Sequence, residues 1–130
     1  MPLVRITIRS GQSAAYKKEL LDGIHKALIQ AFKIPEHDRY QILHELGPEH
    51  FETPPAKTEK VTMIEITAFK GRSNEAKKQL YQVMVENLAK NPGINGEDIM
   101  IIIHEPPLEN WGIRGGKPAS EVQLGFKVDV

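Results

Sequence analysis

The chain has 130 residues, a length that fits a single domain with a substantial core and is too short for two independent ones. Lys and Arg total 17 and Asp and Glu total 17, so charge favours neither a nucleic-acid partner nor an anionic membrane surface. The absence of cysteine excludes disulfides, zinc-thiolate sites and a cysteine nucleophile. Because no segment is typical of an export signal or a membrane span, we expect a cytoplasmic protein.

An internal repeat organises the sequence. With an offset of 60 residues, the first half of the chain matches the second half without a gap. The matching pairs include Ile6 and Ile66, Thr7 and Thr67, Gly11 and Gly71, Ser13 and Ser73, Lys17 and Lys77, Leu20 and Leu80, Leu28 and Leu88, Ile34 and Ile94, Asp38 and Asp98, and His44 and His104. We infer a duplication within one domain of residues 1–130, with repeats at about 2–58 and 62–118.

The first repeat opens with an alternating pattern that favours a β-strand. The residues on its apolar face are Val4, Ile6 and Ile8. Gly11 then breaks the strand, and Ser13 is placed to cap a helix that has an apolar stripe. The stripe comprises Leu20, Ile24, Leu28 and Ala31. Pro35 ends this helix, and the aliphatic segment RYQILHE predicts a second strand.

The second repeat has the same β-α-β pattern. Its first strand has an apolar face of Ile64, Ile66 and Ala68. Gly71 and Ser73 again separate strand from helix, the segment NPGINGED ends the helix, and IMIIIHE predicts the last strand of the repeat. The Gly- and Pro-rich segment at about 106–130 predicts a loop followed by a short final strand or arm that reaches across a subunit boundary. Its apolar finish comprises Val122, Leu124 and Phe126.

These elements predict an α+β fold built from two tandem β-α-β repeats. A right-handed crossover makes the two strands of each repeat parallel neighbours. Duplicated units commonly pair about a pseudo-twofold axis, which gives a four-stranded mixed sheet with both helices on one face. The other face stays uncovered and apolar, and a second copy of the chain is the simplest partner for it. We therefore expect a homo-oligomer.

Differences between the repeats indicate where the chemistry lies. Pro2 opens the first strand, and removal of Met1 would leave it with a free secondary amine. Asp38 precedes the parallel neighbouring strand and so lies near Pro2, while Lys70 and Arg72 follow the antiparallel third strand at the same edge of the sheet. An amine, a carboxylate and two cations together predict a pocket for a small carboxylic acid.

The initial Met-Pro, the segment FKIPEHDRYQILHE, the second β-α-β unit and a late tryptophan resemble the tautomerase superfamily, which has the β-α-β fold of macrophage migration inhibitory factor. Within it, malonate semialdehyde decarboxylase and its relatives are the most similar. The resemblance implies a homotrimer, a catalytic Pro2 and neither metal nor organic cofactor. It also implies that Asp38 works with Pro2.

The family's Arg-Pro-Arg segment, which holds the substrate carboxylate, corresponds here to Lys70-Gly71-Arg72. Arg72 keeps the second arginine, whereas a lysine cannot make the planar two-pronged contact of a guanidinium. The resemblance therefore implies that Arg72 and Lys70 bind the carboxylate, and that Trp111 forms an aromatic wall of the pocket.

The chemistry depends on the protonation state of Pro2. A neutral amine is a general base for keto-enol tautomerisation of 2-oxo acids such as phenylpyruvate, or a nucleophile that forms an iminium. A protonated amine is an acid that stabilises the enolate formed by decarboxylation, and Asp38 favours this form. We expect decarboxylation of malonate semialdehyde or a similar 3-oxo acid, with tautomerase side activity.

Two alternatives stay open. In the first, keto-enol tautomerisation is the main activity of the enzyme. In the second, the chain is a non-catalytic trimeric protein that serves as a binding or scaffold protein. His44 and His104, each followed by Glu, occupy equivalent strand ends in the two repeats, which favours a structural role over metal binding. A retained Met1 would turn the Pro2 nitrogen into a tertiary amide without basicity.

Overall fold

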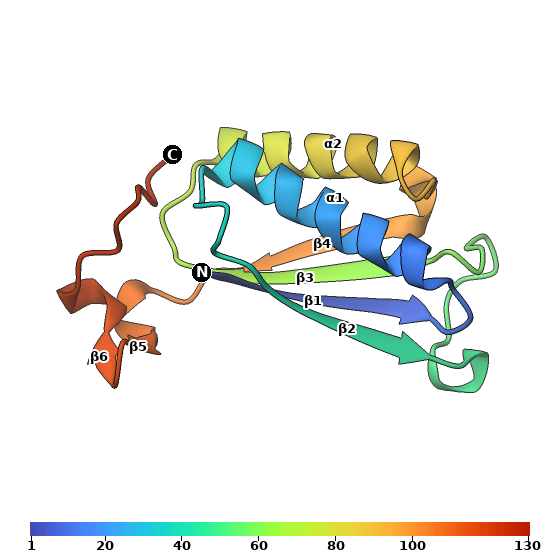
Figure 1. Ribbon diagram of the computed structural model, residues 1–130, viewed down its shortest axis with the longest axis horizontal. Coiled ribbons are helices and arrows are strands. Elements are labelled where there is room, and N and C mark those ends of the chain that lie inside the picture. The colour runs from blue at the N-terminus through green and yellow to red at the C-terminus, as the bar shows by residue number, and fades with distance from the viewer.

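The computed structural model describes residues 1–130 and contains two β-α-β units followed by a C-terminal segment (Figure 1). The first unit comprises β1 (Pro2–Arg9), α1 (Ala14–Phe32) and β2 (Tyr40–Leu46). The second comprises β3 (Thr62–Ala68), α2 (Asn74–Lys90) and β4 (Ile99–His104). The predicted elements of the two repeats are confirmed in order and type.

The four long strands form one mixed sheet in the order β2-β1-β3-β4. Within each unit the two strands are parallel, and the central strands β1 and β3 are antiparallel. Pro2 at the start of β1 lies opposite Ala68 at the end of β3. The predicted pseudo-twofold arrangement is therefore confirmed, and it brings the beginning of β1 and the end of β3 to one edge of the sheet.

Both helices cover the same face of the sheet (Figure 1). Each starts at the predicted serine: the hydroxyl oxygens of Ser13 and Ser73 accept hydrogen bonds from the amides of Tyr16 and Ala76, both at 3.1 Å. The core lies between helices and sheet. Its fully buried members include Ile6, Ile8, Leu20, Ile24, Leu28, Phe32, Ile64, Ile66, Leu80, Met84 and Leu88. These are the stripes that helical and strand periodicity predict.

The opposite face of the sheet has no covering element (Figure 1). Large apolar side chains are exposed there, with Ile42 50% and Met100 55% accessible. Tyr40, at the start of β2, is 53% accessible. The expectation of one open, partly apolar sheet face is therefore confirmed.

The C-terminal segment lies beyond the edge of the sheet at which β1 begins (Figure 1). It forms a short hairpin of β5 (Gly112–Ile113) and β6 (Lys117–Pro118). The predicted short strand at residues 122–126 is absent, since Gly125 has a φ of 83°, which interrupts an extended run. The chain then returns to the sheet edge, where the Ser73 amide donates to the Val130 carbonyl at 3.0 Å. Neither helix combines the length and the apolar character needed to cross a membrane.

Candidate active site

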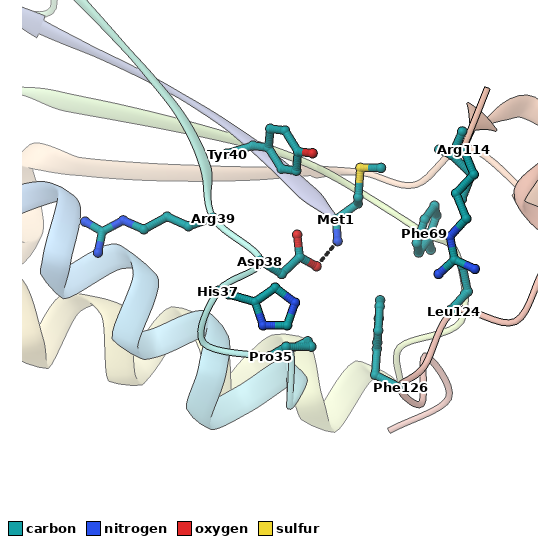
Figure 2. Close-up of a pocket in the computed structure, with 11 residues that line it drawn as sticks. Met1, Pro35, His37, Asp38, Arg39, Tyr40, Phe69, Arg114, Leu124 and Phe126 are labelled. Carbon is teal, nitrogen blue, oxygen red and sulfur yellow. Dashed lines mark hydrogen bonds and ion pairs between the residues drawn. The ribbon is translucent and has the colours of Figure 1, made fainter. Parts of the chain in front are cut away.

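The predicted amine and carboxylate meet at this edge of the sheet. Pro2 is the first residue of β1, and Asp38 lies in the loop between α1 and β2, one strand away. The amino group of Met1 donates to the Asp38 carboxylate in an ion pair (Figure 2). Because Met1 is bonded directly to Pro2, the carboxylate of Asp38 lies beside the position of the first amine of the chain.

Burial and charge act against each other on this amine. Removal from water lowers the pKa of the Met1 amino group, and the nearby positive charge of Arg72 lowers it further. The hydrogen bond and charge of Asp38 raise the pKa, but less than burial and Arg72 together lower it. The edge of the sheet therefore favours the neutral form of an amine more than water does.

Arg72 lies in the protein interior, close enough for its charge to act on the Met1 amine. Its side chain is 5% accessible, its guanidinium carbon lies 4.9 Å from the centre of the Phe32 ring, and its Nη1 donates to the Phe69 carbonyl at 3.2 Å. Its Nε and Nη2 have no hydrogen-bond partner. Desolvation lowers the pKa of Arg72, which Glu105 and Asp38 oppose. Two buried donors on a cation without a paired anion are able to receive a carboxylate.

A cavity of about 600 Å³ opens at this edge. Figure 2 shows two walls, one from the α1–β2 loop with Pro35, His37 and Asp38, and one from the C-terminal segment with Arg114, Leu124 and Phe126. The complete lining comprises Met1, Pro35, His37, Asp38, Arg39, Tyr40, Phe69, Ile113, Arg114, Leu124 and Phe126. Asp38 is the only acidic residue among them.

Of the predicted site residues, only Asp38 belongs to this lining. Pro2 and Arg72 are buried next to it in the sequence-predicted positions but do not line the cavity. Lys70 is exposed, and its backbone amide donates to the Pro106 carbonyl at 3.4 Å. Trp111 is buried behind the wall: its ring packs edge-on against Phe69 with centroids 4.7 Å apart, and its Nε1 donates to Pro106 at 3.1 Å. Trp111 therefore supports the lining residue Phe69.

The sequence reasoning missed most of the second wall. Leu124 and Phe126 contact the cluster around Phe69, and Phe126 stacks on that ring with centroids 6.4 Å apart. Arg114 was not singled out because a two-residue hairpin has no hydrophobic period to reveal it. The Arg-Gly-Gly turn at residues 114–116 was the available signal, since it places a long cation in a tight turn.

Groups with metal-binding chemistry do not gather here. No cluster of three or more His, Cys, Asp or Glu side chains is positioned to hold a metal ion. His44 lies on β2 and His104 on β4, the two outer strands of the sheet, so the repeated histidines do not converge.

Comparisons with known proteins agree with this geometry. A family model described as "Tautomerase enzyme" matches residues 38–114, and a second model with the same description matches residues 2–53. The probable tautomerase YrdN of Bacillus subtilis (strain 168) is 30% identical over 122 residues, covering 90% of this chain and 94% of that protein.

Solved structures have the same fold. The FG41 malonate semialdehyde decarboxylase inhibited by 3-bromopropiolate superposes with a TM-score of 0.81 at 29% identity, over 89% of this chain and 92% of that one. A symmetric trimer of wild-type fused 4-OT superposes with a TM-score of 0.80, over 91% of this chain and 96% of that one. Because the two sequences are only 21% identical, this likeness shows the fold alone. Together with the family models, these likenesses show that the chain belongs to the tautomerase superfamily of enzymes.

Proposed function

We propose that the chain is an amino-terminal-proline enzyme that acts on a small oxo acid. The pairing of the first amine with Asp38, within reach of the charge of buried Arg72, is the observation that carries this proposal. Methionine aminopeptidase removes Met1 because the side chain of Pro2 is small. The Pro2 nitrogen then changes from a tertiary amide to a secondary amine, one residue from the position where Asp38 holds the Met1 amine.

The substrate carboxylate binds to Arg72. Its Nε and Nη2 are the unpartnered buried donors of the region, and a charge-assisted pair of hydrogen bonds would satisfy both. Lys70 adds positive charge at the surface of the same turn. Trp111 does not contact the substrate. It holds in place the Phe69 ring, which lines the cavity.

Decarboxylation of malonate semialdehyde or a similar 3-oxo acid follows from these roles. The bond between the carboxylate carbon and the α-carbon breaks, carbon dioxide leaves, and the electron pair moves into an enolate. Protonated Pro2 stabilises the developing enolate oxygen, or neutral Pro2 first forms an iminium that accepts the electrons. A proton added to the α-carbon completes the aldehyde product on the first route. On the iminium route, water is lost when the iminium forms, the protonated α-carbon regenerates an iminium, and addition of water releases the aldehyde and free Pro2. Asp38 orients Pro2 or activates water.

Tautomerisation of 2-oxo acids is a second candidate, supported by a specific observation. Burial lowers the pKa of an amine at this edge despite Asp38, which favours the neutral base. Such a base removes the enol proton of a 2-hydroxy-2-enoic acid, and C3, the carbon next to the new carbonyl, gains a proton to give the 2-oxo acid. The relative from Bacillus subtilis is itself described as a probable tautomerase.

We further propose that the working form is a cytoplasmic homotrimer of single-domain chains. The open sheet face supports association, because exposed Ile42 and Met100 need a partner. The C-terminal arm, residues 106–130, lies at the sheet edge where it could contact a neighbouring subunit. A fused relative of the same fold is described as a symmetric trimer.

The first test compares the processed protein with Pro2→Ala. Intact mass establishes loss of Met1, and both proteins are then assayed for malonate semialdehyde decarboxylation and phenylpyruvate tautomerisation. We expect Pro2→Ala to lower kcat/KM about 10²- to 10⁴-fold, the usual contribution of a positioned acid or base. If processed protein turns over neither compound faster than the variant, the amine-enzyme proposal fails and a trimeric binding or scaffold role is the better account.

A further inference from the structure

His25 is a buried histidine of α1 that the proposed reaction does not use. The residue is 5% accessible, and its Nε2 lies 2.7 Å from the backbone carbonyl oxygen of Glu36. Because a carbonyl oxygen only accepts hydrogen bonds, Nε2 carries a hydrogen and donates it. Glu36 belongs to the segment between α1 and β2 that also contains Asp38. His25 therefore ties helix α1 to the loop that brings the carboxylate to the first amine.

The segment that presents Asp38 is a tight turn. The Asp38 amide donates to the Pro35 carbonyl at 3.0 Å, which closes a turn of four residues. The hydrogen bond from His25 reaches Glu36, the second residue of this turn. The other three residues of the turn line the active-site cavity (Figure 2). A contact from α1 to this turn therefore also supports one wall of the cavity.

A second contact from α1 flanks Asp38 on its other side. Arg39, the next residue along the chain, pairs with Asp22 at 2.7 Å. The side chains of this pair are 38% and 31% accessible, and an ion pair so open to water contributes little to holding a loop. Of the two contacts, only that of His25 comes from a buried side chain.

The second repeat supplies an internal comparison. At the offset of 60 residues, Val85 of α2 corresponds to His25, and Gly96 corresponds to Glu36. A Cβ placed on Gly96 would lie 3.0 Å from a methyl carbon of Val85, so the side chain at this helix position again lies against the turn. The turn forms there too, with the equivalent hydrogen bond from the Asp98 amide at 2.9 Å. The turn therefore does not need a histidine in order to form.

We propose that His25 is a positioning residue, which holds the turn at residues 35–38 so that the Asp38 carboxylate stays beside the first amine. This inference rests on the proposed function, in which that amine belongs to Pro2. The repeat that begins with the amine has the hydrogen-bonding histidine, and the repeat without the amine has a valine in its place. A directional hydrogen bond fixes the turn more narrowly than a methyl contact does, as a functional group requires of its support.

Loss of the His25 bond should affect the amine through Asp38. Asp38 and Arg72 are the charged groups that act on the first amine: Asp38 raises its pKa and Arg72 lowers it. Arg72 donates to the Phe69 carbonyl and makes no hydrogen bond to the turn. A turn that no longer holds Asp38 in place therefore weakens the group that raises the pKa and leaves the group that lowers it. The pKa of Pro2 should fall.

The test measures the pKa of Pro2 directly, from the nitrogen-15 shift of the amino-terminal proline of the processed protein as pH is varied. His25→Val copies the second repeat and so should fold, and it should lower the pKa of Pro2 by about 1, at the low end of the effect of a neighbouring opposite charge. His25→Asn, whose amide is too short to reach Glu36, should have the same effect. His25→Gln should restore the wild-type pKa, since its longer amide can donate from nearly the same place. In an Asp38→Asn background, His25→Val should cause no further change.

Asn87→Ala is the matched control. Asn87 Nδ2 donates to the Gly23 carbonyl at 3.1 Å, so this variant also loses one bond from a side-chain nitrogen to a backbone carbonyl, but between the two helices. It should leave the pKa of Pro2 unchanged.

Four results would each overturn the proposal: an unchanged pKa in His25→Val and His25→Asn, an equal change in Asn87→Ala, no rescue by His25→Gln, or a further change in the Asp38→Asn background. The titration needs no turnover. A His25-dependent pKa in a protein without Pro2-dependent activity would therefore support the positioning role while refuting the amine-enzyme proposal.

Discussion

Asp38 opposes the effect of burial on the first amine of the chain. Its hydrogen bond and negative charge stabilise the protonated amine and so raise the amine pKa, against the lowering by burial and Arg72. In the processed protein we expect the same carboxylate to act on Pro2. Asp38→Asn removes the charge and keeps the shape, and should therefore lower the pKa of Pro2.

This prediction has a definite sign in the pH dependence of tautomerisation. Neutral Pro2 is the base, so kcat/KM rises as pH increases through the amine pKa. With a lower pKa, the neutral form persists to lower pH, and the rising limb of the Asp38→Asn profile should move to lower pH. Profiles of kcat/KM for phenylpyruvate measure this limb. A limb that moves to higher pH, or does not move, contradicts the role of Asp38 as the group that raises the pKa.

At the residue scale, the sequence predicted the location of those candidate residues whose position follows from topology. Pro2, Asp38 and Arg72 flank predicted strands, so the order of the strands was enough to bring them to one edge. Trp111 was predicted to line the pocket, but it packs behind Phe69, which lines the cavity in its place. The sequence does not reveal this order of the two rings. Arg114 depends on a non-periodic turn, and its position follows only from tertiary contacts.

At the scale of elements, the repeat supplies a matched pair of helix caps. Ser13 and Ser73 each accept a hydrogen bond from a first-turn amide, so each substitution by alanine should lower the free energy of unfolding by about 1 kcal/mol. Only Ser73 follows Arg72 directly, so only its side-chain cap lies beside a proposed binding residue. Ser73→Ala should therefore also raise KM, whereas Ser13→Ala should not.

Urea unfolding and steady-state kinetics of the two cap variants check this pair. Both caps have the same hydrogen-bond distance, 3.1 Å, so both variants should lose the same free energy of unfolding. A difference in KM between them would therefore report an effect on substrate binding and not on stability. Equal effects on KM would show that the start of α2 does not position Arg72. The helices and strands could be predicted from the sequence because their signals are local. Helix caps, helix- and strand-breaking glycines and apolar periodicity are each encoded within one turn or one strand.

At the scale of the whole molecule, the open sheet face is the surface that the proposed trimer would cover. Ile42 on β2 is 50% accessible on the face that no helix covers. A buried carboxylate without a partner is strongly unfavourable at a subunit interface, so Ile42→Glu should dissociate the trimer. Tyr81→Glu is the matched control, since Tyr81 is 38% accessible but lies on α2, in the helical layer.

Sedimentation equilibrium distinguishes the expected species. The wild-type protein and Tyr81→Glu should have three times the chain mass of 14.6 kDa, whereas Ile42→Glu should have the mass of one chain. Because the amine, Asp38 and Arg72 all belong to one chain, a folded Ile42→Glu monomer that retains Pro2-dependent turnover would show that one subunit holds the complete site. Loss of turnover with an intact fold would instead show that a neighbouring subunit, packed against the open face, completes the cavity wall. A trimeric Ile42→Glu would exclude this face from the interface.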